Sequence, residues 1–572
     1  MSQPNIIITF VESYWKILLI IAIYWQTVLI LKQYGILERY NITNHGPLLM
    51  IRTTKGQRFL DRIAKLRGFW RIFADVGIPL MLLGMFLMFA LIIFSDISML
   101  VSLENETMPP PGEFHELRNI FLLPGINEFI PLVWGLIGLV VTLVVHEFSH
   151  AILCKVEDVK VKSMGIIMVL IPIGGFAEPD EEQLFGDTKD KTDEEGTEKR
   201  PDIHPVGRRQ RVRILSAGVM ANFVTALVAF MLFFIVIGNI AAVTNVMITD
   251  VVPGSPADDM GLTDLTLITH VNGNKIENAS DFYEYVDTRS ENESLQLMVK
   301  KDNILQEVML TPYPNVNGNI RGVKFENVIP GMPGEDAGLK DGLIITRINN
   351  TPITGTQTFF EYMANTTAGQ EITMCTLFEN VEVNYTINLT SDSSNGNTGF
   401  IGISEFSTVI ISRSTGLSVG EYPARELLHF LQMIPTLMGG VAGWIIILVL
   451  PFPNPLFWSF QGFSGTLSMF YEPIGWAAPL GVGVFWLANS LLWIGWLNFY
   501  VGLFNCLPML PLDGGHVFKD MIHSILARLF GNEEKMGDMA GKIATLFAIL
   551  MLASLIFMII APFIAQFLAH VF

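Results

Sequence analysis

Cysteine is scarce in this chain, which has only three in 572 residues: Cys154, Cys375 and Cys506. No two of them form a C-x-x-C pair, so the sequence predicts neither a disulfide framework nor a zinc ribbon. Charged residues are also few, at 16% of the chain, and the formal net charge is −18. A chain this acidic has no electrostatic attraction for nucleic acid, and we expect no nucleic-acid partner.

Long apolar runs are what the sequence has instead. Hydrophobic residues make up 51% of the chain and the mean hydropathy is +0.45, a balance typical of membrane proteins. Five runs are long enough to cross a lipid bilayer as helices, near 8–31, 76–98, 128–153, 214–240 and 543–569. Two more complicated apolar regions lie at 427–450 and 477–510. We therefore predict a polytopic α-helical membrane protein with about six to eight spans.

The third apolar run contains His146, Glu147 and His150 in the pattern H-E-x-x-H. On a helix, residues four apart project from one face, so both imidazoles can reach one Zn²⁺ at about 2.0–2.1 Å. Glu147 can face the open coordination position and accept a proton from water. Two histidines satisfied by local hydrogen bonds are the plain alternative. The apolar surroundings favour the metal site, because ionisable groups at membrane depth are costly unless they have a function.

A second polar group ends the apolar region 477–510. Asp513 is followed by two glycines and needs a partner at this depth, and its carboxylate suits Zn²⁺ as a third ligand at about 2.0–2.2 Å. Asn505 has two interpretations that the sequence leaves open. It can donate to a developing oxyanion, or it can satisfy carbonyls freed by Pro508 and Pro511.

Two other residues compete with Asp513 for the position of third ligand. Cys154 follows His150 by one helical turn, but a small packed residue fits that position better than a ligand. His516 is a weaker candidate because it lies past the expected membrane boundary.

The stretch 163–180 is apolar but too short to span a bilayer, and it contains Gly174, Gly175 and Phe176. We predict a hairpin or re-entrant strand that lies beside the metal site. Such a hairpin can hold an unwound substrate strand by pairing with its edge. The three residues are therefore candidate substrate-binding residues.

The soluble block near 243–412 contains an internal repeat with an offset of 77 residues. The segment 252–262 reappears as 329–339, and the register continues without gaps to Phe282 and Phe359. The P-G-x-P turn and the strand-turn after it resemble the circularly permuted, protease-associated type of PDZ domain. This resemblance implies two PDZ domains in tandem, which bind peptide C-termini by strand addition. The alternative is a pair of structural β-modules that bind nothing.

The motifs together resemble the site-2 protease family of intramembrane zinc metalloproteases. They are H-E-F-S-H in one span, A-G-V-M-A-N-F at 217–223 in the next, the PDZ-like block, and N-x-x-P-x-x-P-L-D-G-G from Asn505. The resemblance implies that His146, His150 and Asp513 bind zinc and that Glu147 is the general base. It also implies that Asn505 steadies the substrate carbonyl, and that the substrates are membrane proteins with a transmembrane helix.

Basic residues concentrate between Arg52 and Arg71, and the positive-inside rule places this loop in the cytoplasm. The H-E-x-x-H span then runs inward, with the active site toward the cytoplasmic side of a cell membrane and the PDZ-like block outside. Asp513 can meet the histidines only if an odd number of crossings follows that block. Either 427–450 is re-entrant or interfacial, which we favour, or a further crossing lies within 477–510.

These observations divide the chain into seven expected regions. They are N-terminal spans with a basic loop (1–127), a first catalytic half (128–240), PDZ 1 (243–320), PDZ 2 (321–412), a membrane-associated region (413–476), a second catalytic half (477–520) and a C-terminal loop and span (521–572). The predicted function is intramembrane proteolysis with the PDZ pair limiting substrate access. A catalytically silent PDZ scaffold and a metal transporter are the alternatives.

Overall fold

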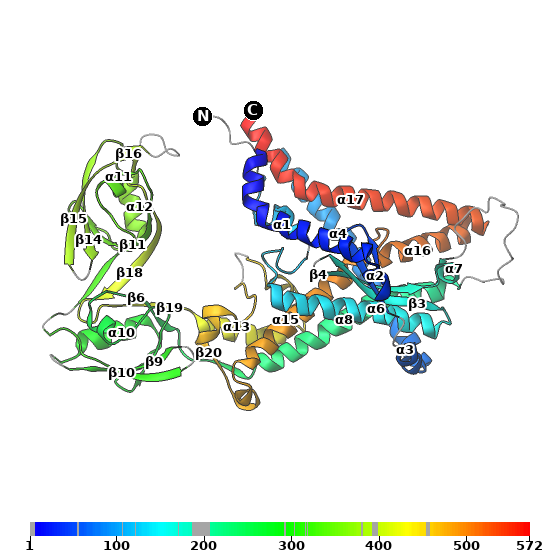
Figure 1. Cartoon of the computed structure of the whole chain (residues 1–572), viewed down its shortest axis with the longest axis horizontal. Helices are drawn as coiled ribbons and strands as arrows, with labels where there is room; N and C mark the ends of the chain where they lie inside the picture. The colour runs from blue at the N-terminus through cyan, green and yellow to red at the C-terminus, as the bar shows by residue number, and fades with distance from the viewer. Residues whose placement is uncertain are drawn as a thin grey trace. The chain divides into compact units, whose positions relative to one another are not determined.

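The computed structural model describes residues 6–571 with short gaps, and the chain forms two compact units (Figure 1). The residues outside the description are 1–5, 54–56, 106, 121, 170, 186–205, 291–292, 302–303, 315, 317, 379–380, 392–397, 454–457 and 572. The first unit comprises Met1–Ile235, Trp444–Gly462 and Trp486–Phe572. The second comprises Val236–Gly443 and Phe463–Phe485.

Within the described residues, five helices are long and apolar enough to cross a membrane. They are α4 (Arg67–Glu104), α6 (Leu132–Val156), α8 (Arg208–Ile237), α15 (Gly483–Phe504) and α17 (Glu533–Val571). The predicted run 8–31 lies in α1 (Ile6–Gln33), which is not among the five. A membrane protein with several apolar helices and a β-rich region is therefore confirmed. The count of about six to eight spans stays a prediction.

Small residues bring the apolar helices into close contact. A Cβ atom added to Gly77 on α4 would lie 2.8 Å from Met220 Cβ on α8. One added to Gly138 on α6 would lie 2.7 Å from the carbonyl oxygen of Trp493 on α15. Backbones that approach this closely gain packing where no water-driven hydrophobic effect operates between helices. These contacts join α4 to α8 and α6 to α15.

The first unit also contains a four-stranded antiparallel sheet. Its order is β1 (Ile42–His45), β2 (Leu48–Thr53), β3 (Val161–Val169) and β4 (Ile171–Pro179). The β3–β4 hairpin lies where the sequence predicts one. Strands β1 and β2 come from the segment in which the basic cluster begins, and Leu49 pairs with Met168 across the sheet. The shorter helices of this unit are α2 (Ile36–Arg39), α3 (Gln57–Ala64), α5 (Leu117–Ile120), α7 (Glu181–Phe185) and α16 (Asp513–Phe530).

The second unit contains the repeat, and its elements recur at the offset found in the sequence. In the first repeat module they are β6 (Val246–Val251), α9 (Pro256–Asp259), β7 (Leu267–Val271), β8 (Asn274–Lys275), α10 (Ala279–Thr288), β9 (Leu295–Lys301) and β10 (Ile304–Leu310). In the second they are β11 (Asn319–Val328), α11 (Pro333–Asp336), β12 (Ile344–Ile348), β13 (Thr351–Pro352), α12 (Thr356–Ala364), β14 (Glu371–Phe378), β15 (Val381–Asn388), β16 (Thr390–Ser391), β17 (Gly399–Phe400) and β18 (Ile403–Ser412). Each module has its own core of buried aliphatic and aromatic side chains.

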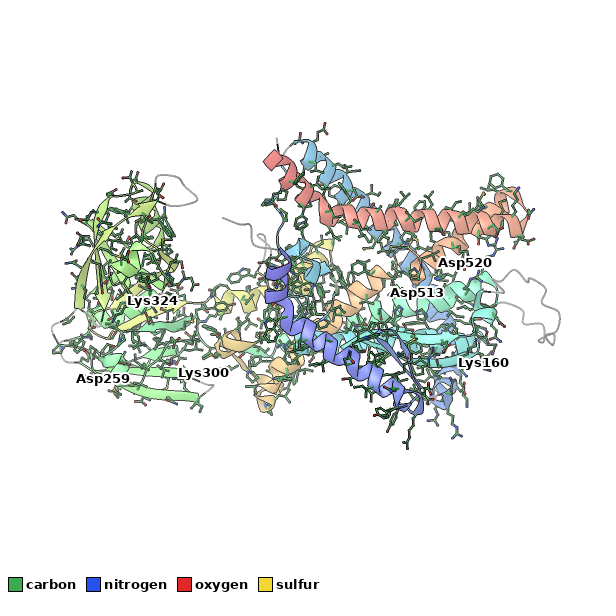
Figure 2. The ribbon with its side chains drawn as sticks, turned by 45° about the horizontal axis from the view of Figure 1, so that its top comes forward. Lys160, Asp259, Lys300, Lys324, Asp513 and Asp520 are labelled. Carbon is green, nitrogen blue, oxygen red and sulfur yellow. The ribbon has the colours of Figure 1, made fainter. Side chains whose placement is uncertain are left out.

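The first module is completed only after the second has been traversed. Strand β19 (Leu417–Glu421) pairs with β6, and its Leu417 and Val419 lie in the first core. The expected boundaries 243–320 and 321–412 leave this strand outside both modules. Lys324 on β11, labelled in Figure 2, forms an ion pair of 3.1 Å with Asp250 on β6, so the two modules are also joined directly.

The region 413–476 contains two short helices rather than one long one. Helix α13 (Ala424–Leu437) has 14 residues and α14 (Val441–Val449) has 9. Each is shorter than the roughly 20 residues that a crossing needs. The remaining elements near them are β5 (Ile240–Ala242), β20 (Tyr471–Pro473) and two 3₁₀ turns, Gly465–Phe470 and Gly475–Leu480.

Candidate active site

Three potential metal ligands meet inside the first unit. His146 and His150 lie on α6, and their Nε2 atoms are 3.1 Å apart. Asp513 is the first residue of α16, and its Oδ2 atom lies 3.2 Å from each of these nitrogens (Figure 2). Two ligands of a tetrahedral Zn²⁺ with bonds of about 2.0–2.1 Å are themselves roughly 3.3 Å apart. The three atoms therefore have the spacing of one face of a zinc coordination shell.

The Asp513 carboxylate lies beside the two histidines in a buried position. Its Oδ2 atom is buried and has no hydrogen-bond partner among the described residues, and the side chain is only 15% exposed. Burying a carboxylate oxygen without a partner costs free energy on the order of several kcal/mol, as does burying any unpaired charge. A cation between Asp513 and the two histidines removes this cost, so the residues present fit a zinc ion.

Hydrogen bonds behind the histidines orient their rings. His150 Nδ1 lies 2.8 Å from the carbonyl oxygen of Ile214, which can only accept. The proton of His150 is therefore on Nδ1 and its Nε2 is free to bind metal. His146 Nδ1 lies 3.2 Å from the side-chain amide of Asn222. The Oδ1 atom of Asn222 is buried without a partner among the described residues, and exchanging the amide oxygen and nitrogen lets it accept from His146 Nδ1–H.

Helix α8 supplies both this asparagine and a glycine that the ligands require. A Cβ atom added to Gly218 would lie 2.4 Å from His150 Nε2 and 2.7 Å from His146 Cε1. No residue with a side chain fits there while the histidines keep their places. Gly218 and Asn222 are four residues apart and so share one face of the helix. The 217–223 stretch is part of the family resemblance, but reasoning from the sequence assigned no roles to these two residues.

Asn222 offers a test of the ligand geometry. We expect Asn222→Ala to lower zinc affinity about 10- to 100-fold, because partners that orient ligating histidines have effects of that size. The measurement is zinc retention by the purified chain against a graded chelator. Asn489→Ala is the control, since it removes a buried amide that lies against Gly462 rather than a histidine. Equal zinc retention in both variants would contradict the assignment.

Glu147 lies between the metal-ligand set and the hairpin. Its Oε2 atom accepts a hydrogen bond of 2.7 Å from the backbone N–H of Ala177 on β4. A Cβ atom added to Gly175 would lie 2.6 Å from Glu147 Cγ, so the strand can approach only because residue 175 is glycine. Gly174 pairs with Ile167 in the hairpin, and the Phe176 ring lies 5.6 Å from the Arg52 guanidinium. Of the three predicted hairpin residues, Gly175 contacts a predicted catalytic residue.

Side-chain hydrogen bonds and an ion pair also join β2 to β3 and β4 within this sheet. Arg52 Nη1 on β2 donates to Glu178 Oε2 on β4 at 2.5 Å, and Ser163 Oγ on β3 reaches the same oxygen at 2.5 Å. These bonds join three strands at the end of β4 that follows Ala177. The strand that contacts Glu147 is thereby held in register.

Ion pairs fix helix α16 and with it the position of Asp513. Arg211 on α8 donates to both carboxylate oxygens of Asp520 on α16, at 2.7 and 2.6 Å, and both side chains are nearly buried. Bidentate pairs of this kind are stronger and more directional than single contacts. The start of α16 is also packed tightly, since a Cβ atom on Gly514 would lie 2.4 Å from the carbonyl oxygen of Leu507.

Asn505 and Cys154 have different surroundings from the three ligands. The side-chain amide of Asn505 donates to the carbonyl oxygen of Val501 at 3.0 Å, and the main-chain carbonyl of Asn505 accepts from Gly514 N–H at 2.8 Å. Cys154 is buried in an apolar cluster with residues such as Leu153 and Ala217. It is not part of the metal-ligand group. Asn505 therefore connects the end of α15 with the start of α16.

A histidine pair, a carboxylate ligand and an adjacent glutamate on apolar helices define a membrane-embedded metallohydrolase. Comparison with known proteins agrees: residues 134–552 match the model of peptidase family M50. The chain belongs to this family, the site-2 proteases, and is an intramembrane zinc metalloprotease.

Individual relatives are distant in sequence. The chain is 22% identical to protease RseP of Yersinia pestis over 479 residues, which cover 74% of this chain and 98% of that protein. It is 27% identical over 291 residues to an uncharacterized protein of Methanocaldococcus jannaschii, covering 50% of this chain and 68% of the relative. A Clostridium perfringens homologue named as a zinc metalloprotease is 23% identical over 232 residues, 38% of this chain and 64% of its own length.

Proposed function

We propose that the enzyme hydrolyses peptide bonds within or near transmembrane segments of membrane proteins, in regulated intramembrane proteolysis. The observation that carries the proposal is the set of His146, His150 and Asp513, with Glu147 between this set and an edge strand. The test is cleavage of a reconstituted single-span substrate, with the cut mapped by mass spectrometry. A cut inside the apolar segment supports the proposal, and cuts confined to soluble loops contradict it.

The chemistry divides between the metal and the protein. His146, His150 and Asp513 would hold zinc, and the bound ion would supply a Lewis acid for the scissile carbonyl and for water. Glu147 accepts a proton from the attacking water and returns it to the leaving amine. The hydrogen bond from Ala177 N–H holds the Glu147 carboxylate at the edge of β4.

Strand β4 is the proposed binding edge for an unwound substrate. It is the last strand of its sheet, and Ala177 N–H points away from β3 toward Glu147. Residues two apart on a strand face the same edge, so the backbone of Gly175 also lies there. A transmembrane helix hides its carbonyls in hydrogen bonds and must unwind before water can attack. Pairing with β4 replaces the lost bonds and presents an extended strand beside Glu147.

Asn505 keeps its proposed role as a donor to the oxyanion. Its amide has two N–H groups, and among the described residues one of them is used, in the bond to Val501. The second is available to a substrate carbonyl oxygen. The bond to Val501 equally supports the alternative in which Asn505 serves its own helix.

The lengths of the helices support the proposed topology. Between α8 and Asp513, α15 is the one described helix long and apolar enough to cross. A single crossing is odd, as the meeting of Asp513 with the histidines requires. We therefore place α13 and α14 at the interface or in a re-entrant position, the active site toward the cytoplasm and the repeat modules outside.

The two repeat modules, which we identify as PDZ domains, differ at the groove between the helix and the last strand. In the first, the Tyr283 hydroxyl on α10 accepts from Val419 N–H at 2.8 Å and donates to the carbonyl oxygen of Ile410 at 2.5 Å. Burial raises the pKa of Tyr283 to about 12, so the hydroxyl stays protonated at neutral pH. The backbone donor that an added peptide strand needs is therefore already occupied.

The second module has Phe360 at the position equivalent to Tyr283, 77 residues later, and phenylalanine has no hydroxyl to close the groove. A cavity of about 330 Å³ lies here, lined by apolar residues of α12 and the segment 398–406. We propose that this module, rather than the first, receives a peptide C-terminus with an apolar side chain.

The modules are also proposed to act as a size filter, because they are inserted between the two catalytic halves. Their ends lie together, since Tyr422 N–H donates to the carbonyl oxygen of Asn245 at 2.8 Å. Replacing 246–421 by a short flexible linker therefore removes both modules with little strain on the rest of the chain. We expect this variant to cleave a substrate with its bulky ectodomain intact as fast as one already trimmed, measured in proteoliposomes.

Two outcomes would contradict the size filter. One is equal discrimination between trimmed and untrimmed substrates with and without the modules. The other is loss of cleavage of the trimmed substrate, which points to recruitment by peptide binding. Phe360→Tyr distinguishes filtering by size from recruitment by peptide binding. It places in the second groove a hydroxyl like the one that closes the first groove, and it leaves both modules in place.

The match to a peptidase family argues against the two alternative functions, a silent scaffold and a metal transporter, and each alternative has its own test. Absence of bound zinc in the purified chain favours the scaffold. Zinc flux across proteoliposomes without substrate cleavage favours the transporter.

A further inference from the structure

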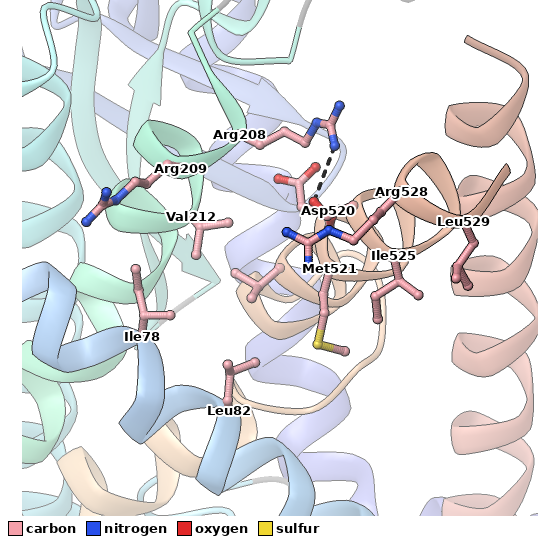
Figure 3. A pocket seen from close by; sticks show the side chains of 12 residues that line it. Ile78, Leu82, Arg208, Arg209, Val212, Asp520, Met521, Ile525, Arg528 and Leu529 are labelled. Atoms are coloured by element: carbon pink, nitrogen blue, oxygen red, sulfur yellow. Dashed lines mark hydrogen bonds between the residues drawn. The ribbon is translucent and has the colours of Figure 1, made fainter. Parts of the chain in front are cut away.

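A second feature of the first unit is a groove of about 700 Å³ between α4, α8 and α16 (Figure 3). One wall is a stripe on α16 formed by Val517, Met521, Ile525 and Leu529, each four residues from the next. This spacing places them on one face of the helix. Leu529 is 68% exposed and Ile525 is 48% exposed. The stripe is therefore an apolar surface that needs an apolar cover.

The rim of the groove is cationic. It includes Arg208, Arg209 and Arg528 (Figure 3). The charge of Arg208 is matched by an ion pair with Glu533. Asp520, the acidic residue that lines the groove, is matched by Arg211. Arg208 and Asp520 are therefore each paired with an opposite charge, and the net charge of the rim depends on Arg209 and Arg528.

Neither Arg209 nor Arg528 has a good partner in the described part of the chain. Arg209 lies 3.5 Å from Asp75, but that carboxylate already accepts two bonds of 2.7 Å from Arg213. The Arg209 side chain is 76% exposed. Arg528 is exposed in the last turn of α16, and no ion pair is found for it among the described residues. The rim therefore carries, beside an apolar trough, one arginine that shares its carboxylate with Arg213 and one that has no ion pair among the described residues.

The groove lies at the cationic end of an apolar helix, where the boundary of a bilayer is expected. The arginines from Arg208 to Arg213 begin α8, and the apolar part of this span follows directly from Ile214. The opposite wall, Ile78 and Leu82, belongs to the membrane helix α4. Cations at the end of an apolar run mark the boundary between the bilayer and water. A molecule that fits must be apolar along its length and anionic at its end.

We propose that this groove binds one anionic phospholipid. The acyl chain lies against the α16 stripe and the wall of α4, and the phosphate lies at Arg209 and Arg528. Basic pockets between membrane helices bind anionic headgroups in this way. Because α16 begins with Asp513, a lipid that holds α16 between α4 and α8 also steadies the third metal ligand. The lipid is then a structural cofactor of the protease.

The test uses the full-length chain in nanodiscs of equal phosphatidylcholine and phosphatidylglycerol, followed by native mass spectrometry of the retained lipid. We expect a preference for phosphatidylglycerol on the order of thirtyfold, about fivefold for each cation near the surface. The double variant R209Q/R528Q should retain the two lipids equally. The matched control is R58Q/R62Q on α3, which removes two exposed arginines of the same unit outside the groove. It should keep the preference.

Three results would overturn the proposal. The first is an unchanged preference in R209Q/R528Q, and the second is an equal loss in R58Q/R62Q, which indicates attraction to net charge alone. The third is displacement of the retained phospholipid by inorganic phosphate at about 10 mM, on the order of a saturating anion concentration. Displacement by free phosphate would show that the arginines bind any anion and that the apolar trough does not contribute. Leu82→Trp, which fills the trough without changing charge, should also reduce retention of phosphatidylglycerol.

Discussion

Glu147→Gln is expected to retain zinc and to lose cleavage of a reconstituted membrane substrate by about two to four orders of magnitude in kcat. Glutamine has nearly the same shape, so His146 and His150 keep their places on α6. It cannot accept a proton from water, and this removes the general base. The Ala177 N–H still finds an oxygen on the substituted side chain, so β4 keeps its position.

The measurement is single-turnover cleavage in proteoliposomes, with zinc content determined on the same preparation. Gly175→Ala is the informative companion, because its Cβ atom would press against Glu147 Cγ without changing any ionisable group. It should reduce cleavage with zinc retained, as a displaced base does. Full activity of Glu147→Gln would refute the proposed base, and loss of zinc would move Glu147 from catalysis to metal binding.

The apolar helices were predictable because their cause is local. A chain inside a bilayer must satisfy its own backbone groups, so a long apolar run gives a helix whatever surrounds it. The runs 76–98, 128–153, 214–240 and 543–569 correspond to α4, α6, α8 and α17. The 77-residue repeat was predictable for a similar reason, since α10 and α12 start 77 residues apart in both sequence and structure.

Contacts between distant segments were not predictable from local pattern. Strands β1 and β2 are short, and the basic cluster that begins at Arg52, within β2, is the stronger signal in that part of the chain. Their place beside β3 depends on pairs such as Leu49 with Met168. Strand β19 joins β6 across about 170 residues, so a repeat read along the chain ends too early.

The candidate site shows the same division. The H-E-x-x-H spacing predicts which two histidines can share a metal, and the cost of a carboxylate at membrane depth singles out Asp513. The structure brings these three together. Asn222 and Gly218 carry no such signal, because an asparagine and a glycine in an apolar helix are each compatible with ordinary packing. Only the distances to His146 and His150 reveal what they contact.

Asp513→Ala is expected to lower zinc affinity strongly. Loss of a residue that only orients a ligating histidine costs about 10- to 100-fold, and loss of a ligand should cost well over that. Asp513 is the one oxygen donor in the ligand group, and its Oδ2 atom lies equally close to both histidine nitrogens. Without it two imidazoles remain, too few to hold zinc against a moderate chelator. His146→Ala should have an effect of the same size.

Cys154→Ala is the control for this loss. Cys154 follows His150 by one turn of α6, but it packs in an apolar cluster and should leave zinc binding unchanged. Zinc per chain, measured by inductively coupled plasma mass spectrometry after dialysis against the chelator, distinguishes the variants. If Cys154→Ala loses zinc while Asp513→Ala retains it, the third ligand is the cysteine. The contact of α16 with α6 would then serve packing alone.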